Sequence, residues 1–191
     1  YNMSTDIFVV DTQWLIERLE EEAQKEHPEK LRYVLRDLAA ESGAFAYEYT
    51  GYLANIHSVE TYYQANIDML DLHKFYSLFS PNQKIHTKVK NEEPTYYAPG
   101  CEVNTSQFAS GSIVEGKVVR SVVSRNVQIH KDSLVKESIV FPRVVIGEGA
   151  QVEYAIIDKG AEVADGVVIR GTAENPVVIK KGEKITEDIL S

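Results

Sequence analysis

The chain contains 191 residues, 43% of them hydrophobic, and carries a formal net charge of −9 at pH 7. This balance is typical of a globular protein with a buried core. The acidic charge argues against nucleic acid as a partner, because phosphate binding requires clustered Lys and Arg. The chain has no run of about 18 apolar residues, which a membrane-spanning helix would need, so no membrane partner is expected.

The chain has a single cysteine, Cys101, which cannot form an internal disulfide. No charged-then-apolar N-terminal segment is present either, and a cytoplasmic location is therefore expected. Cys101 is either a small buried residue or a nucleophile, and no motif around it favours the nucleophile.

The first part of the chain predicts an α/β segment. Residues 7–10, Ile-Phe-Val-Val, predict a short buried strand, and Thr12 is placed to cap a helix whose apolar residues recur at helical spacing. A second helix is expected from Glu29 to Ser42, with Gly43 just after its end.

Two extended pieces, residues 44–49 and 53–56, and a third helix complete residues 1–80. Ser58 can cap that helix. Its apolar and aromatic residues are Val59, Tyr62, Tyr63, Ile67 and Leu70. Because these elements are too few to cover both faces of a parallel sheet, residues 1–80 are expected to be the C-terminal part of a larger α/β domain.

Residues 81–99 are polar, contain three prolines and lack periodicity, which predicts a linker. Residues 100–191 instead show an internal repeat in which apolar positions recur every 17 residues. The three columns are Val118, Val135, Val152 and Ile169; the segments Ser121–Val123, Ser138–Val140 and Ala155–Ile157; and Ile129, Ile146 and Val163. Short apolar steps recurring about every six positions predict a left-handed parallel β-helix of hexapeptide repeats, whose stacked coils share one core.

Several details refine this prediction. The glycines at 147, 149, 160 and 166 supply conformational freedom at the corners of the coils, and the row from Ile169 to Ile185 breaks the pattern at Ala173 and Glu174 as a terminal cap would. A β-sandwich of short strands is the alternative fold. It is disfavoured because sandwich strands vary in length and spacing. An open coil end also needs covering, so oligomerisation is expected.

The segments Gly51–Ser58 and Glu60–Asp68, together with Ser138–Pro142, Val144–Gly147 and Ala155–Lys159, resemble the C-terminal portion of the glucose-1-phosphate adenylyltransferase family. This resemblance covers nearly the whole chain. It implies that residues 1–80 are the C-terminal part of a nucleotidyltransferase (Rossmann-like) domain that precedes the β-helix.

The chain departs from the family where catalysis would occur. The resemblance places Asn55 where the family has an Asp that holds Mg²⁺, and His57 where it has a glycine, next to Ser58 in the same substrate loop. An uncharged amide is a poor replacement for a carboxylate ligand of a hard cation. The family's His-Asp-Phe-Gly stretch and its Gly-rich nucleotide loop are also missing. We expect no catalytic residue, metal site or cofactor in this chain, although Asn55 could instead simply complete a strand-end hydrogen bond.

The resemblance therefore implies an accessory, non-catalytic subunit that tunes a catalytic partner in glycogen synthesis. That partner would bind the Mg²⁺, and the two would form a hetero-oligomer. In activated members, lysines grip an anionic sugar-phosphate effector, and Lys159 and Lys180 match two such positions. Both could equally be solvated surface lysines.

Two other functions remain open. A hexapeptide acyltransferase would use a histidine of the β-helix as general base, and His130 is the only candidate. Such an enzyme would form trimers and bind acyl-CoA. The second open function is that of a regulatory or scaffolding subunit with the same two-part layout, and a helical C-terminal extension would favour it.

Overall fold

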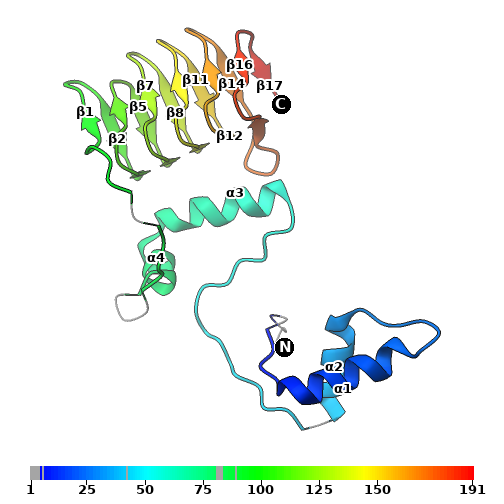
Figure 1. Cartoon of the computed structure of the whole chain (residues 1–191). Coiled ribbons are helices and arrows are strands. Elements are labelled where there is room, and N and C mark those ends of the chain that lie inside the picture. Colours follow the sequence, from blue (N-terminus) through cyan, green and yellow to red (C-terminus); the bar gives the residue numbers. More distant parts are fainter. Residues whose placement is uncertain (1–4, 6, 42, 81–83, 89) are drawn as a thin grey trace. The chain divides into compact units, whose positions relative to one another are not determined.

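The computed structural model describes residues 5, 7–41, 43–80, 84–88 and 90–191. It divides into two compact units, Tyr1–Thr50 and Gly51–Ser191, which are described separately (Figure 1). The first unit contains helices α1 (Thr12–Ala23) and α2 (Leu31–Glu41). The second contains two further helices, a 3₁₀ turn and all the strands.

The cap of α1 differs from the predicted one by one residue. The carboxylate of Asp11 accepts a hydrogen bond from the Trp14 amide at 2.9 Å, so Asp11 is the capping residue and Thr12 is the first helical residue. Helix α2 begins at Leu31, two residues later than predicted, and the carbonyl of Lys30 accepts the first helical hydrogen bonds, from the amides of Tyr33 and Val34. Ser42, the predicted end of α2, lies outside the described residues.

The predicted buried strand at residues 7–10 is wrong. Ile7 is 79% exposed and Val9 is 99% exposed, and no strand is formed there. The extended pieces at residues 44–49 and 53–56 also join no sheet. A strand is stabilised by hydrogen bonds to neighbouring strands, and the described residues offer these three pieces no such neighbour.

The second unit begins with helix α3 (Val59–Ile67), followed by a 3₁₀ turn (Asp68–Leu70) and helix α4 (Leu72–Leu78). Ser58 caps α3 as predicted: its hydroxyl accepts from the Thr61 amide at 3.1 Å, and Thr61 Oγ1 accepts from the Ser58 amide at 3.0 Å. Helix α4 was not predicted. Asp71 caps it by accepting from the amides of His73 and Lys74.

The rest of the second unit is a parallel β-helix, which confirms the predicted fold class (Figure 1). Its short strands stack into three sheets. Sheet A contains β1 (Tyr96–Tyr97), β4 (Ile113–Val114), β7 (Gln128–Ile129), β10 (Val145–Ile146), β13 (Glu162–Val163) and β16 (Lys184–Ile185). Sheet B contains β2 (Glu102–Asn104), β5 (Lys117–Val119), β8 (Leu134–Lys136), β11 (Gln151–Glu153), β14 (Val168–Arg170) and β17 (Ile189–Leu190). Sheet C contains β3 (Gln107–Phe108), β6 (Val122–Val123), β9 (Ile139–Val140), β12 (Ala155–Ile157) and β15 (Val177–Ile179).

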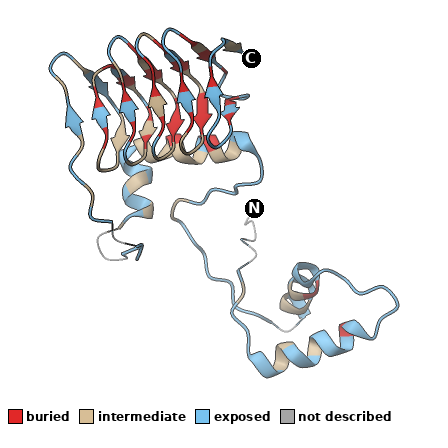
Figure 2. Ribbon diagram, turned by 45° about the horizontal axis from the view of Figure 1, so that its top comes forward, coloured by how far each residue is buried: buried red, intermediate tan, exposed pale blue. Residues whose placement is uncertain are grey.

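The predicted columns are the observed pairing register. Val118, Val135, Val152 and Ile169 pair in sequence across sheet B, and all four are fully buried. The buried residues run continuously through the coils (Figure 2). The 17-residue period fails at both ends. Val103 pairs with Val118 after 15 residues, and Ile157 pairs with Ile179 after 22 because residues 171–176 form an extra loop. The last pair of sheet B, Ile169 with Ile189, has a spacing of 20.

The corners of the coils require left-handed backbone, and many non-glycine residues supply it. Gly149, Gly160 and Gly166 have positive φ as predicted. Seven other residues do so without the freedom of glycine: Thr105, Arg120, Asn126, Asp132, Glu137, Arg143 and Tyr154. Gly147 is required for a different reason, because a Cβ there would lie 2.5 Å from Asp165 Oδ1.

A ladder of serines joins consecutive coils at the corner between sheets B and C. The Ser138 amide donates to Ser121 Oγ at 3.1 Å, and the Ala155 amide donates to Ser138 Oγ at 3.1 Å. Each hydroxyl in turn donates to a carbonyl two residues earlier in its own coil, Val119 O for Ser121 and Lys136 O for Ser138. Both serines are fully buried, so these bonds satisfy polar groups that water cannot reach.

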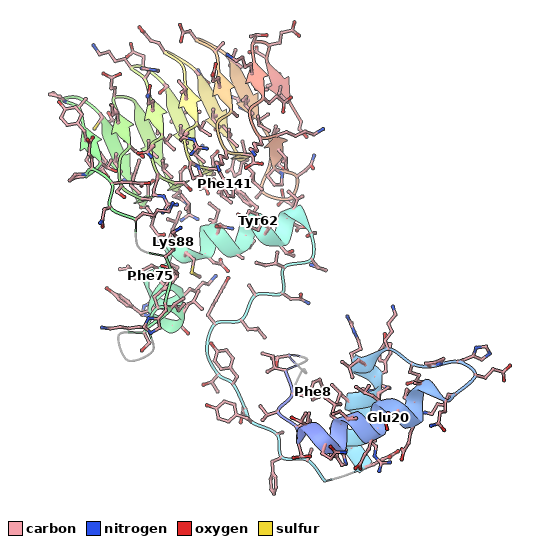
Figure 3. The ribbon with its side chains drawn as sticks, in the orientation of Figure 1. Phe8, Glu20, Tyr62, Phe75, Lys88 and Phe141 are labelled. Carbon is pink, nitrogen blue, oxygen red and sulfur yellow. The ribbon has the colours of Figure 1, made fainter. Side chains whose placement is uncertain are left out.

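Helix α3 packs on the outward face of sheet C. Tyr63 and Ile67 of the helix form a buried cluster with Ile139 and Ile156 of the sheet. Tyr62 and Phe141 lie against the same cluster, and Figure 3 shows them in the space between helix and sheet. The aromatic side chains of α3 thus help to join the helix to the β-helix.

The packing of α3 also sets the boundary between the two units. The division lies between Thr50 and Gly51, whereas the sequence groups α3 with residues 1–80. Sheet A likewise begins at Tyr96, inside the predicted linker 81–99, of which residues 81–83 and 89 lie outside the described residues. The apolar face of α3 thus packs against the β-helix, although the sequence pattern groups α3 with residues 1–80 and the coils with residues 100–191.

Candidate functional site

The segment Gly51–Ser58, which carries Asn55 and His57, is anchored to the helices at its beginning. The Tyr52 amide donates to Ser77 Oγ at 2.9 Å, and the Tyr52 hydroxyl donates to Asp68 Oδ2 at 3.0 Å. Burial and the hydrogen bond to Asp68 together raise the pKa of Tyr52 to about 12. The start of the segment is therefore held by both α4 and the turn after α3.

Asp68 is the centre of this anchor. Besides Tyr52, its carboxylate accepts from Lys74 Nζ at 2.6 Å and from Gln64 Nε2 at 2.9 Å. Burial raises the pKa of the Asp68 carboxyl, but the hydrogen bonds from Lys74, Gln64 and Tyr52 outweigh burial and hold the pKa below its usual value. Asp68 is thus an ionised acceptor that joins α3, α4 and the segment.

The other end of the segment is held by the capping box of α3. The His57 amide donates to Thr61 Oγ1 at 3.1 Å, and His57 Nδ1 lies 3.2 Å from the same oxygen. Ser58 is the capping residue itself. His57 and Ser58, both named from the sequence as substrate-loop positions, therefore have a structural role at the start of α3.

Asn55 lies between these two anchors and is exposed. It ends no strand, so the strand-end alternative is not what the structure shows. No Asp or Glu occurs in the segment Gly51–Ser58. A single neutral amide oxygen does not fit the carboxylate-rich donor set that Mg²⁺ prefers. Within the described part of the chain, no three His, Cys, Asp or Glu side chains are grouped to hold a metal ion.

A groove of about 500 Å³ lies beside the segment, where the first turn of α3 meets sheet C. The sequence did not predict it, since it depends on α3 packing across the coils. Its lining is mainly apolar and comprises Ile56, His57, Ser58, Val59, Tyr62, Ile156 and Val178. The groove therefore joins the segment that carries Asn55 to the outward face of the β-helix.

Lys159 and Lys180 are brought to the same corner of consecutive coils. Ile157 pairs with Ile179, which places Lys180 directly across from Asp158, and the Gly182 amide donates to Lys159 O at 3.1 Å. Neither ammonium forms an ion pair with a described residue, but carboxylates lie close to both: Asp158 Oδ1 accepts from the Lys159 amide at 2.7 Å, and Glu183 Oε2 accepts from the Lys180 amide at 2.9 Å. This corner therefore carries both cationic and anionic side chains.

His130, the acyltransferase candidate, lies at another corner of the β-helix. Its Nδ1 is 3.3 Å from Glu115 Oε2, and both side chains are partly exposed. The groove described above does not include His130. The contact therefore lies at the surface, where polar pairs of this kind contribute little to stability.

No described helix has the length and apolar character that crossing a membrane would require.

Comparison with known proteins places the coils in a family. Residues 93–188 match the family model described as GlmU-like, C-terminal hexapeptide. The glycogen biosynthesis protein GlgD of Bacillus subtilis is 35% identical over 136 residues, which cover 71% of this chain and 40% of that protein. The glucose-1-phosphate adenylyltransferase of Corynebacterium jeikeium is 28% identical over 194 residues, covering 92% of this chain and 48% of that protein. The corresponding enzyme of Bacillus mycoides is 31% identical over 140 residues, covering 72% and 37%.

The chain spans less than half the length of these curated relatives. The match to the first two extends beyond the coils, in agreement with the resemblance seen in the sequence. The family model itself covers half of the chain and coincides with the observed β-helix. The chain therefore belongs to the family of GlmU-like C-terminal hexapeptide proteins.

Proposed function

We propose that this chain is part of an accessory subunit of glucose-1-phosphate adenylyltransferase, and that it tunes ADP-glucose formation for glycogen biosynthesis without catalysing it. The similarity to GlgD and to glucose-1-phosphate adenylyltransferases supports the pathway. The catalytic subunit would be its partner in a cytoplasmic hetero-oligomer and would bind the Mg²⁺.

Asn55 is the observation that carries this proposal. The segment around it is anchored at both ends, by Tyr52 and by the capping residue Ser58, so a side chain at position 55 is presented at a defined place. That side chain is an uncharged amide. Nucleotidyl transfer needs a hard anionic oxygen to hold Mg²⁺ against the phosphates, and loss of one such ligand weakens metal binding and transition-state stabilisation.

The corner that carries Lys159 and Lys180 supports a regulatory role. Lys159 and Lys180 occupy adjacent coils, and neither ammonium is ion-paired within the described residues, although Asp158 and Glu183 accept hydrogen bonds from the backbone amides of the two lysines. Ammonium groups bind phosphate as point charges. We propose that a sugar-phosphate effector binds at this corner.

Co-purification and activity assays test the proposal. The full-length protein is expressed with the catalytic adenylyltransferase subunit from the same cell, and ADP-glucose synthesis is measured for each subunit and for the mixture. We expect no synthesis by this protein alone and a changed rate or effector response in the mixed complex. Absence of both association and kinetic change would contradict the proposal.

Charge variants test the effector site within the same complex. Lys159→Ala and Lys180→Ala should each raise the effector concentration needed for half-maximal response about tenfold, a loss of about 1.4 kcal/mol. The matched control is Lys131→Ala, which removes an exposed lysine at another corner. An equal effect of Lys131→Ala would show that only overall charge matters.

A further inference from the structure

A second pocket lies on the outward side of sheet B, at the first two strands of the stack, β2 and β5 (Figure 1). Its volume is about 550 Å³, within the range of about 300–1,000 Å³ that small-molecule sites occupy. Seven residues line it: Glu102, Val103, Asn104, Thr105, Lys117, Val119 and Arg120. None of them belongs to the groove on sheet C or to the corner of Lys159 and Lys180.

Two ion pairs stand at opposite ends of the sheet B pocket. At the start of the strands, Lys117 Nζ lies 2.6 Å from Glu102 Oε2. At the corner after β5, Arg120 Nε lies 2.7 Å from Glu137 Oε1. Because Lys117 and Arg120 are three residues apart, at most about 10 Å separates their α-carbons. This span accommodates a single sugar ring with its hydroxyl groups.

The surface between the two ion pairs is apolar. Val119 points outward from β5 and is half-buried, and Val103 on β2 is 41% exposed. The methylene stems of Lys117 and Arg120 add further carbon to the walls. A ligand in the pocket therefore meets an apolar floor and has charged groups at both ends.

Asn104 and Thr105 add uncharged hydrogen-bonding groups. The Thr105 hydroxyl donates to Asn104 Oδ1 at 2.6 Å, so the amide nitrogen of Asn104 remains a donor and Thr105 Oγ1 remains an acceptor. The backbone holds this end in place, because the Arg120 amide donates to Asn104 O at 3.0 Å. Thr105 and Arg120 both have positive φ and occupy the same corner of consecutive coils.

The charges around the pocket balance. Each charged side chain of β2, β5 and β8, and of the corners that follow these strands, belongs to an ion pair: Lys117 with Glu102, Arg120 with Glu137, and Lys136 with Glu153. No excess charge therefore favours an anion or a cation. A hydroxyl group both donates and accepts hydrogen bonds, so paired N–H donors and carboxylate acceptors suit a neutral ligand with several hydroxyls.

We propose that the sheet B pocket binds one hexose unit of a neutral carbohydrate. The C–H face of the sugar ring lies on Val119, and hydroxyls at its two ends bond to the Lys117 and Arg120 ion pairs. Asn104 donates to a further hydroxyl. A free hexose and a unit of a glucan chain present this same chemistry.

An NMR titration of the whole chain tests the proposal, with glucose and maltotriose as probes. We expect saturable shifts of the amide signals of residues 102–105 and 117–120, with a dissociation constant on the order of 1 mM. Tighter binding of maltotriose than of glucose would identify a glucan as the source, and equal binding a free hexose. Only the choice of α-linked glucose rests on the proposed function. Failure of sugar binding would leave co-purification with the catalytic subunit unaffected, so the two proposals fail separately.

Protein variants locate the site. Val119→Asp should weaken maltotriose binding about tenfold, because it replaces the apolar floor by a carboxylate. Its matched control is Val145→Asp, another half-buried outward valine, on sheet A. Lys117→Ala should weaken binding about threefold through loss of a hydrogen bond. Its control is Lys184→Ala, which removes an exposed lysine paired with Glu162 at 2.8 Å on sheet A. Both controls should bind as the parent chain does, and amide signals outside the pocket verify that the fold is retained.

Three outcomes would overturn the proposal. The first is the absence of saturable shifts up to about 20 mM maltotriose. The second is an equal loss of binding in a variant and its matched control, which would show that the sugar does not occupy this pocket. The third is displacement of maltotriose from the same signals by an equal concentration of inorganic phosphate, because the pocket would then be an anion site.

Discussion

The Tyr63 hydroxyl donates a hydrogen bond to the backbone carbonyl of Glu137 at 2.8 Å and thereby fastens helix α3 to a corner of the β-helix. Glu137 has a positive φ, so its carbonyl is presented by a left-handed corner. The phenol itself is 2% exposed, and its burial raises its pKa. One bond thus joins an apolar helix face to a special backbone position 74 residues away.

Tyr63→Phe should lower the free energy of unfolding by about 1 kcal/mol, because it removes this hydrogen bond and leaves the Glu137 carbonyl without its donor. Tyr63→Ala should cost about 3–5 kcal/mol, since the ring is then lost from the cluster with Ile139 and Ile156. Urea unfolding checks both values. Tyr76→Phe is the control, because Tyr76 is exposed on α4, and a similar loss there would contradict the role of the bond.

Asp68 predicts an acid-dependent stability. The pKa of its carboxyl is held below the usual 3.8 in the folded chain, so ionised Asp68 stabilises the fold above that pH. This contribution is lost as the pH falls through the lowered value. Asp68→Asn should therefore reduce the decrease in unfolding free energy between about pH 6 and about pH 2.

The control for Asp68 is Glu174→Gln, which changes an exposed carboxylate in the loop 171–176. Its acid dependence should match that of the parent chain. Hydrogen exchange gives a second readout with the variant Asp68→Ala, which removes the acceptor of the Tyr52 hydroxyl. Amide exchange should become faster in the segment Gly51–Ser58 and remain unchanged in the coils. Unchanged exchange in Asp68→Ala would contradict the anchoring role.

The serine ladder gives a third prediction. Ser138→Ala removes the acceptor of the Ala155 amide, a buried donor, and should cost about 1–3 kcal/mol of unfolding free energy. Ser124→Ala is the matched control; Ser124 follows β6, whereas Ser138 precedes β9. Ser124 is only half-buried, and its change should remain within about 0.5 kcal/mol. Equal losses in urea unfolding would show that the ladder has no special contribution.

The sequence predicted the coils well because a β-helix repeats one local solution. Val118, Val135, Val152 and Ile169 are buried for the same reason in each coil, so their spacing is visible without any knowledge of distant contacts. The cap at Ser58 was also predictable, since its partner Thr61 is only three residues away. Both inferences depend on local or periodic signals.

The features that the sequence predicted wrongly or not at all depend on contacts between distant residues, which no local sequence pattern contains. Residues 7–10 have a strand-like sequence, but a strand forms only where neighbours offer hydrogen bonds. The anchor at Asp68 joins Tyr52 and Lys74, which come from either side of α3, and the groove needs α3 to lie across sheet C. Lys159 and Lys180 were named from the resemblance, and only the 22-residue coil shows that they share a corner.

The corners give the last prediction, because two glycines there are required for different reasons. Gly149 has a φ of 67° and open space around an added Cβ, so Gly149→Ala introduces only backbone strain and should cost about 1 kcal/mol. Gly147→Ala should cost more, since its Cβ would lie 2.5 Å from Asp165 Oδ1 and 2.6 Å from the Asp165 amide. Arg143 has a φ of 61° and an exposed side chain, so Arg143→Gly should relieve strain and stabilise the chain by up to about 1 kcal/mol, whereas Arg143→Ala should not. Thermal and urea unfolding of the four variants check this order, and a Gly149→Ala chain as stable as the parent would show that the corners tolerate left-handed side chains without cost.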